Sequence, residues 1–84
     1  MEMSYFVYIL ECSDGSLYTG ITKNISKRLD EHNSSPKGAK YTKARRPVKL
    51  VYEEPSQNRS TASKREYEIK KLTRSKKLQL ITLK

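Results

Sequence analysis

The sequence contains few of the residues that build disulfides, zinc sites or membrane spans. Cys12 is the only cysteine among 84 residues, so no intrachain disulfide can form, and we expect a buried apolar role for it in a cytoplasmic protein. One histidine, without companion cysteines or paired acids, argues against zinc and two-metal sites. No apolar stretch approaches the roughly 20 residues of a membrane span, and no basic segment leads into an apolar run as in a signal peptide.

Acidic residues are also scarce, at 9 against 18 lysines and arginines, which gives a net charge of +9. Charge of this sign and size is typical of domains that neutralise nucleic-acid phosphates. An anionic membrane surface is the alternative partner, but no helical segment combines a basic face with a broad apolar face. Nucleic acid is therefore the partner that the composition favours.

Apolar residues make up only 35% of the chain, yet they fall in ordered runs. Such runs are typical of a folded domain and not of a disordered segment. We expect one domain over residues 1–84, with a thin core, because a chain of this length buries only about 60–65% of its unfolded surface.

Two β-branched and aromatic runs begin the chain, at residues 5–10 and 17–22. They are joined by residues 13–16, whose Asp-Gly pair is a hairpin turn signal. Asn24 can cap a following helix over residues 24–33, with inward spacing of Ile25, Leu29 and His32. These patterns predict a β-hairpin followed by a short helix.

Residues 34–47 read as a basic loop, and residues 48–53 as a third strand, with a linker over 54–58. A long helix is predicted to begin near residues 60–63 and to run to about Arg74. Ser63 and Glu66 have capping-box spacing, although Ser60 or Thr61 could also be the cap. Its inward stripe is predicted as Ala62, Tyr67 or Glu66, Ile69 and Leu72.

A last helix, capped by Ser75, would turn Leu78, Ile81 and Leu80 inward. The resulting order is β-β-α-β-α-α, which places the chain in the α/β (α+β) class.

Five polar residues are candidates for a site. Tyr8 and Tyr18 lie on paired strands and can project to one face, although tyrosines often serve only to pack strands. Arg28 and His32 are four residues apart on one helix and share a face, which could equally be a solvated surface. Glu66 lies on the long helix, where an ion pair with Lys70 is the simpler role.

Together these residue types suit phosphodiester hydrolysis. That reaction needs a base for the attacking water, positive charge on the phosphoryl oxygens and usually a divalent metal. Tyrosine or histidine can supply the base, and arginine can bind phosphate in a bidentate manner. One glutamate can hold Mg²⁺ when water and substrate oxygens complete its octahedron.

The same segments resemble the GIY-YIG endonuclease superfamily. Phe6-Val7-Tyr8 resembles the GIY element, and Tyr18-Thr19-Gly20 resembles the YIG element. Residues 22–29 are similar to the second motif, whose arginine falls on Arg28, and His32 stands where the family has tyrosine or histidine. Residues 62–66 resemble the motif of the metal-binding glutamate, which falls on Glu66. The resemblance spans residues 4–82 and is greatest to small single-domain bacterial members.

The resemblance implies a three-stranded antiparallel sheet flanked by helices, and hydrolysis with a single Mg²⁺ or Mn²⁺ ion. It implies that Glu66 binds the metal, that Arg28 stabilises charge at the phosphate, and that Tyr8, Tyr18 and His32 position or deprotonate the water. Which of the three is the base stays open. Gly20 would allow close approach of a neighbouring element or the substrate.

The chain departs from the family pattern at three points: Phe6 replaces the leading glycine, Ile21 stands where excision-repair members have lysine, and no asparagine follows Asn58. A non-catalytic DNA- or RNA-binding module therefore remains the alternative, and a protein-interaction domain without a site is a third. In the basic loop, a nucleic-acid backbone is predicted to contact Lys37, Lys40, Arg45 and Arg46. DNA is favoured over RNA, and we expect a monomer that could take specificity from a protein partner.

Overall fold

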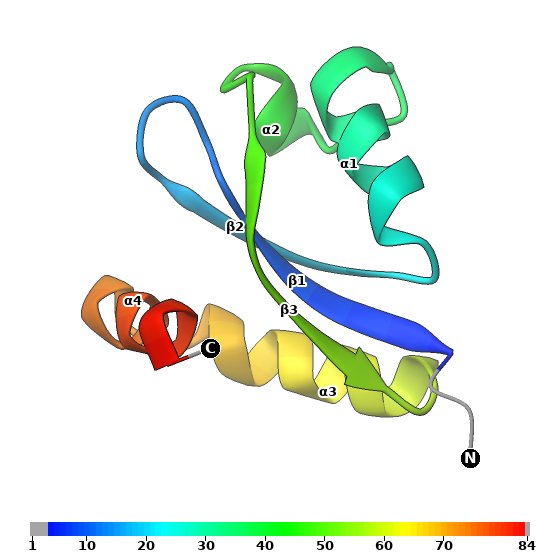
Figure 1. Ribbon diagram of the computed structural model, residues 1–84, viewed down its shortest axis with the longest axis vertical. Coiled ribbons are helices and arrows are strands. Elements are labelled where there is room, and N and C mark those ends of the chain that lie inside the picture. The colour runs from blue at the N-terminus through cyan, green and yellow to red at the C-terminus, as the bar shows by residue number, and fades with distance from the viewer. Residues whose placement is uncertain (1–3, 84) are drawn as a thin grey trace.

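The computed structural model describes residues 4–83 and contains one three-stranded antiparallel sheet (Figure 1). Its strands are β1 (Tyr5–Glu11), β2 (Leu17–Thr22) and β3 (Lys49–Ser56), in the order β2-β1-β3. The helices are α1 (Ile25–Ser34), α2 (Lys40–Lys43), α3 (Arg59–Lys70) and α4 (Arg74–Leu83). The predicted order β-β-α-β-α-α is confirmed, with the single turn of α2 added inside the predicted loop.

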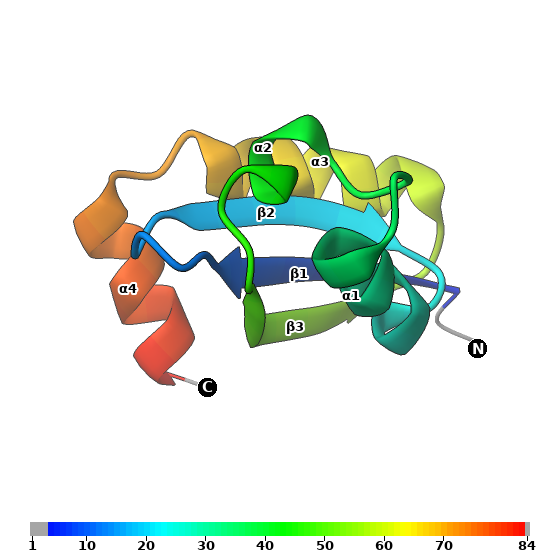
Figure 2. The same cartoon turned by 90° about the horizontal axis from the view of Figure 1, so that it is seen from above.

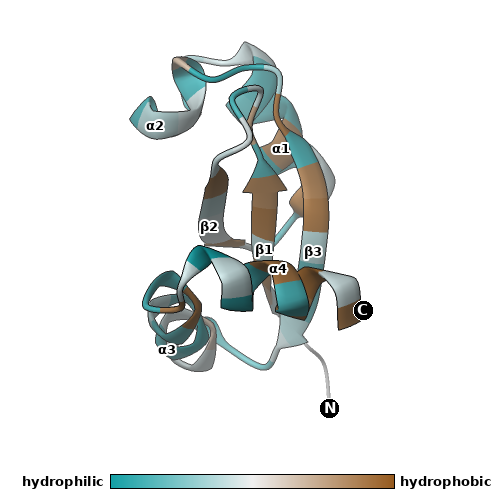
Figure 3. Ribbon diagram, turned by 90° about the vertical axis from the view of Figure 1, so that its left-hand side faces the viewer, coloured by the Kyte–Doolittle hydropathy of each residue, from teal (hydrophilic) through white to brown (hydrophobic). Residues whose placement is uncertain are grey.

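The central strand β1 is covered on both faces, which explains its continuous apolar sequence. Val7 and Ile9 are fully buried in one cluster, with Tyr52 of β3 and Ile69 of α3. Tyr8 and the neighbouring Leu10 belong to a second cluster on the opposite face, together with Cys12 and Val48. Figure 3 shows β1 as the apolar strand between β2 and β3, with helices above and below the sheet.

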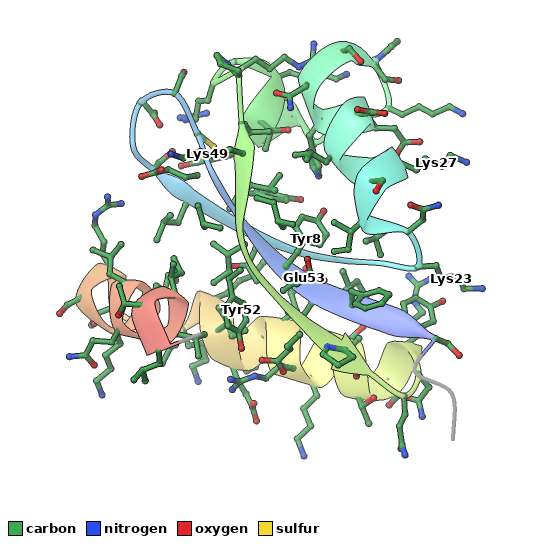
Figure 4. The ribbon with its side chains drawn as sticks, viewed as in Figure 1. Tyr8, Lys23, Lys27, Lys49, Tyr52 and Glu53 are labelled. Atoms are coloured by element: carbon green, nitrogen blue, oxygen red, sulfur yellow. The ribbon has the colours of Figure 1, made fainter. Side chains whose placement is uncertain are left out.

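The two faces of the sheet carry different helices. Ile25 and Leu29 of α1 pack on the Tyr8 face, whereas Leu80 and Ile81 of α4 join α3 on the other. Figure 4 shows Tyr8 between the sheet and α1, and Tyr52 on the side of α3 and α4. Seen from above, α1 lies over one side of the sheet and α3 runs beside β2 (Figure 2). No helix within residues 4–83 is long and apolar enough to cross a membrane.

The hairpin turn between β1 and β2 places the two tyrosine-bearing strands in register. Gly15 has φ +84°, a left-handed conformation that glycine adopts without steric cost. The amide of Cys12 donates to the carbonyl of Ser16 at 2.8 Å and closes the turn. Tyr8 then lies opposite Gly20, and Leu10 lies opposite Tyr18. The predicted hairpin is confirmed.

The segment between α1 and β3, predicted as a loop, is tied to the rest of the fold. The guanidinium of Arg46 donates to the carbonyls of Glu31, His32 and Ser35, which lie at the end of α1. The amide of Asn33 exchanges two hydrogen bonds with the backbone of Val48, at 2.9 and 2.7 Å. The end of α1 is therefore joined directly to the start of β3.

Several predicted boundaries were wrong. β3 continues to Ser56 through most of the predicted linker, since Pro55 is tolerated on an edge strand that needs no outward N–H bond. Asn58, and not Ser63, caps α3 in a capping box with Thr61. Thr73, and not Ser75, accepts the amide of Lys76 at the start of α4.

The predicted inward faces of the last two helices were correct only in part. On α3, Ala62 and Ile69 are fully buried, but Tyr67 is 62% exposed. On α4, Leu80 and Ile81 pack against the core, whereas Leu78 is 40% exposed. The contacts of α4 therefore come from one short stretch of its length.

Candidate active site

Tyr8 and Tyr18 lie on the same face of the hairpin, as predicted from the strand pattern. Gly20 makes room for the Tyr8 ring, because a Cβ at position 20 would come within 2.5 Å of the Tyr8 hydroxyl oxygen. No side chain larger than hydrogen fits there without moving the tyrosine. Gly20 therefore allows the phenol of Tyr8 to lie across β2.

His32 links the two tyrosines to α1. Its imidazole is fully buried, its Nε2 lies 2.9 Å from the Tyr8 hydroxyl, and its Nδ1 lies 2.7 Å from Thr42 Oγ1. The ring also meets Tyr18 edge to face, with a centroid distance of 5.2 Å. Tyr18 in turn stacks on Tyr41 of α2, with a distance of 6.0 Å between the ring centroids. Both tyrosines are thus fixed against one buried imidazole.

Burial keeps this pair of side chains neutral. Desolvation, reinforced by the positive charge of Arg28, lowers the pKa of His32 to about 4. Desolvation raises the pKa of Tyr8 to about 12, although Arg28 opposes the shift by hydrogen bonding and by charge. Near neutral pH the pair therefore consists of an uncharged imidazole and an uncharged phenol.

Arg28 is held at the edge of the same cluster and keeps access to solvent. Its Nη1 donates to Glu31 Oε1 and to the carbonyl of Lys37, both at 2.9 Å, and 27% of its side chain is exposed. Burial alone would lower the pKa of Arg28, but hydrogen bonds to Glu31 and Tyr8 raise it. The guanidinium is therefore a permanent, oriented positive charge beside Tyr8.

Glu66 approaches the cluster from α3, which packs beside the edge strand β2 (Figure 2). The negative charge of Glu66 contributes to raising the pKa of Tyr8, so the carboxylate acts on the phenol electrostatically. Its Oε2 also pairs with Lys70 Nζ at 3.3 Å, the simpler role considered for it. The 23% exposure of its side chain leaves it open to solvent. Within residues 4–83 there is no group of three His, Cys, Asp or Glu side chains that could hold a metal.

The family follows from a comparison with known proteins. A profile of the GIY-YIG catalytic domain matches residues 4–79 of this sequence. The chain belongs to the GIY-YIG family. GIY-YIG domains form a nuclease superfamily, so the resemblance noted in the sequence motifs is confirmed.

Relatives of this GIY-YIG chain include small bacterial proteins. A UPF0213 protein of Desulfotalea psychrophila is 60% identical over 78 residues, which cover 93% of this chain and 71% of that protein. A UPF0213 protein of Staphylococcus aureus is 62% identical over 78 residues, which cover 93% of this chain and 94% of that protein. The solution structure of a UPF0213 protein from Bacillus halodurans matches with a TM-score of 0.62 at 49% identity, covering 95% of this chain and 84% of that one. The α+β fold of this GIY-YIG domain thus agrees with that of a solved relative.

The four basic residues predicted to contact nucleic acid differ in their surroundings in this GIY-YIG domain. Lys37 and Lys40 have exposed side chains. Arg45 pairs with Asp14 at 3.1 Å and lies over the Tyr41 ring at 3.9 Å. Arg46 binds the carbonyls at the end of α1, a structural task that the sequence did not indicate. A role of these four in binding nucleic acid stays a prediction.

Other residues beside the candidate site of this GIY-YIG domain were not singled out from the sequence. Lys23 and Lys27 border an open hollow of about 250 Å³ that Arg28 and Glu31 also line, and Figure 4 shows both lysines near the start of α1. Both lysines lie within residues 22–29, the segment similar to the second motif of the family, and this could have indicated their place beside Arg28. Thr42 contacts His32 only because α2 folds back over α1, and no sequence signal marks that contact.

Proposed function

We propose that this GIY-YIG domain hydrolyses phosphodiester bonds of nucleic acid, DNA before RNA, with one divalent metal ion held by Glu66. The observation that carries the proposal is the convergence of four residues from β1, β2, α1 and α3: Tyr8 and Tyr18 pack against one buried histidine, and Arg28 and Glu66 act on Tyr8. A domain of a nuclease superfamily with a net charge of +9 suits a polyanionic substrate.

In this proposal Arg28 binds the phosphoryl oxygens. Glu31 and the carbonyl of Lys37 fix the guanidinium through Nη1, while the exposed part of the side chain faces the hollow lined by Lys23 and Lys27. A planar guanidinium can then donate two parallel hydrogen bonds to a phosphate. Because it is fixed before substrate binds, little reorganisation is needed as negative charge develops.

Tyr18 is the best-placed general base of the three candidates. Transfer of a proton from Tyr8 to His32 is strongly unfavourable, because burial raises the pKa of Tyr8 to about 12 and lowers the pKa of His32 to about 4. His32 has no exposed surface and cannot contact an attacking water. Tyr18 is only half-buried, so its hydroxyl can reach a water molecule that His32 cannot. Tyr8 then orients the attacking water through its hydroxyl oxygen.

A hard divalent cation fits the donor set available. Glu66 offers one carboxylate with solvent access, which suits Mg²⁺ or Mn²⁺ because these ions keep several waters and use substrate oxygens as further ligands. When bound, such an ion supplies Lewis acidity for the phosphoryl oxygens and the leaving group. The ion pair with Lys70 would have to open or be shared.

The second candidate is a non-catalytic nucleic-acid-binding module on the same fold. The exposed lysines beside Arg28 and the ion pair that occupies Glu66 favour it. Both functions predict binding, and only the first predicts turnover that requires Glu66.

The test compares two isosteric substitutions on α3. Labelled single-stranded DNA, duplex DNA, branched DNA and RNA are incubated with Mg²⁺ or Mn²⁺ and the parent protein, Glu66→Gln or Glu68→Gln. Glu68 is exposed and pairs with Arg65 at 3.4 Å, so its variant matches the loss of charge without touching the site. We expect Glu66→Gln and EDTA each to reduce cleavage by on the order of 100-fold or more, and Glu68→Gln to cleave like the parent. Equal cleavage by both variants would refute the metal role, and binding without cleavage of any substrate would establish the second candidate.

A further inference from the structure

We propose that Thr42 is a positioning residue of the active site, which fixes the tautomer of His32 and thereby the direction of the Tyr8 hydroxyl hydrogen. The effect on turnover rests on the proposed function, whereas the effect on the tautomer does not. Thr42 lies on α2, is fully buried, and is joined to the site by its hydrogen bond with the imidazole.

A continuous chain of hydrogen bonds runs from the sheet to α2. Tyr8 Oη lies 2.9 Å from His32 Nε2, His32 Nδ1 lies 2.7 Å from Thr42 Oγ1, and Thr42 Oγ1 lies 2.9 Å from the carbonyl oxygen of Ala39. A carbonyl only accepts and a threonine hydroxyl has a single hydrogen. If that hydrogen goes to Ala39, then Nδ1 must be the protonated nitrogen and donate to Thr42, which leaves Nε2 as an acceptor for Tyr8.

The opposite tautomer makes poorer hydrogen bonds. With the proton on Nε2, Thr42 would donate to Nδ1, and its bond to the Ala39 carbonyl would be lost. The gain would be an Ala39 amide bond to Nδ1 at 3.5 Å, beyond the usual range for N–H donors. The Nδ1–H tautomer keeps three bonds of 2.7 to 2.9 Å, so it is the favoured one.

The surroundings of Tyr8 favour the same tautomer independently. The Tyr8 side chain is only 3% exposed, so its hydroxyl hydrogen needs an acceptor within the protein. Of the two polar groups that act on the phenol by hydrogen bonding, Arg28 can only donate. The acceptor is therefore His32 Nε2, which must carry no proton.

Within the proposed reaction, this chain sets the orientation of Tyr8. With its hydrogen directed to His32 and one lone pair accepting from Arg28, the phenol oxygen has one lone pair left that can accept a hydrogen bond from the attacking water. In the other tautomer, the Tyr8 oxygen would accept a hydrogen bond from Nε2–H, and its own hydroxyl hydrogen would point away from the imidazole as a donor. Thr42 therefore selects between an accepting and a donating Tyr8 without touching substrate.

The single histidine of the chain makes the test direct. The ¹⁵N resonances of His32 are recorded at neutral pH in the parent, Thr42→Ser and Thr42→Val, because protonated and unprotonated ring nitrogens differ widely in shift. We expect Nδ1–H in the parent and in Thr42→Ser. In Thr42→Val, which preserves shape but removes the acceptor, we expect a shift toward Nε2–H.

Turnover gives the second readout. We expect kcat to fall by roughly 10-fold in Thr42→Val, in keeping with one lost hydrogen bond, with KM little changed and with recovery in Thr42→Ser. A parent protein with the proton on Nε2 overturns the proposal. This outcome is decisive whether or not the protein cleaves nucleic acid, and it does not depend on Thr42→Val being able to fold. An unaltered tautomer in a folded Thr42→Val overturns it too. An Nδ1–H parent without cleavage would leave the positioning of His32 supported and refute only the proposed function.

Discussion

The imidazole of His32 shows how burial decides the chemistry of one side chain. His32 lies four residues after Arg28 on α1, and the face that these two residues share could have been exposed, with the histidine as a base in contact with solvent. Its ring instead lies under Tyr8 and Tyr18 with no exposed surface, and its pKa falls to about 4. The histidine therefore supports the tyrosines and does not titrate near neutral pH.

Acid should weaken the fold through this residue. Above pH 6.5 His32 is neutral in the folded and unfolded states, so burial of its ring carries no protonation penalty and the free energy of unfolding is at its maximum with respect to this residue. Between pH 6.5 and about 4 the unfolded chain binds a proton that the folded chain does not, so stability is lost as the pH falls. The loss should reach roughly 2–3 kcal/mol. Urea unfolding at pH 7.0 and 4.5 measures it.

The control for this experiment is His32→Gln, which removes the titrating ring. The pH dependence between 7.0 and 4.5 should be clearly smaller in the variant than in the parent. If both proteins lose the same free energy of unfolding, the acid sensitivity arises from the carboxylates and the assignment to His32 is wrong.

At the scale of elements, the start of α3 depends on how far β3 extends. Asn58 accepts the amide of Thr61 at 2.9 Å, and Thr61 Oγ1 accepts the amide of Asn58 at 3.3 Å. Asn58→Ala should therefore lower the free energy of unfolding by about 1 kcal/mol, measured by thermal or urea denaturation. Ser63→Ala, at the cap predicted from sequence, should change it by less than about 0.5 kcal/mol. The reverse order would mean that the capping box contributes nothing.

The sequence predicts element types well here because the apolar periods are clear. The runs over residues 5–10 and 17–22, joined by an Asp-Gly turn, predict a hairpin, whereas the burial of the first strand on both faces is seen only in the structure. Helix starts were harder, since residues 56–63 hold six side chains able to cap: Ser56, Asn58, Ser60, Thr61, Ser63 and also Gln57 by its amide. The pairing of Ser56 with Tyr5 decides among them, and that pairing is tertiary.

The candidate site divides in the same way. Strand register places Tyr8 and Tyr18 on one face and helix spacing turns His32 inward, and both can be read from local sequence. Their meeting depends on the packing of α1 against the hairpin. The parts played by Thr42 and Arg46 depend on the path of the segment between α1 and β3. No local pattern specifies that path.

For the whole molecule, the net charge of +9 predicts binding to nucleic acid that weakens steeply with salt. Each phosphate contact should contribute about 0.7–0.9 to the slope of log K against log salt. Lys27→Gln, beside Arg28, should reduce the slope by about one contact, whereas Lys76→Gln on α4, across the sheet, should not. Fluorescence anisotropy at four salt concentrations measures both. Equal effects would indicate diffuse attraction without a defined binding face.

The anchoring of the segment between α1 and β3 has a consequence for association. Arg46 holds its α1 end, the Asn33 amide holds its β3 end, and the Arg45–Asp14 pair joins it to the hairpin turn. A loop that became ordered only on contact with a ligand would lose about 1–2 kcal/mol of backbone entropy per residue at that moment. Here folding has already restricted those residues. A ligand that docks beside Lys37 and Lys40 therefore meets a ready-made surface, and its affinity is not reduced by having to organise the chain.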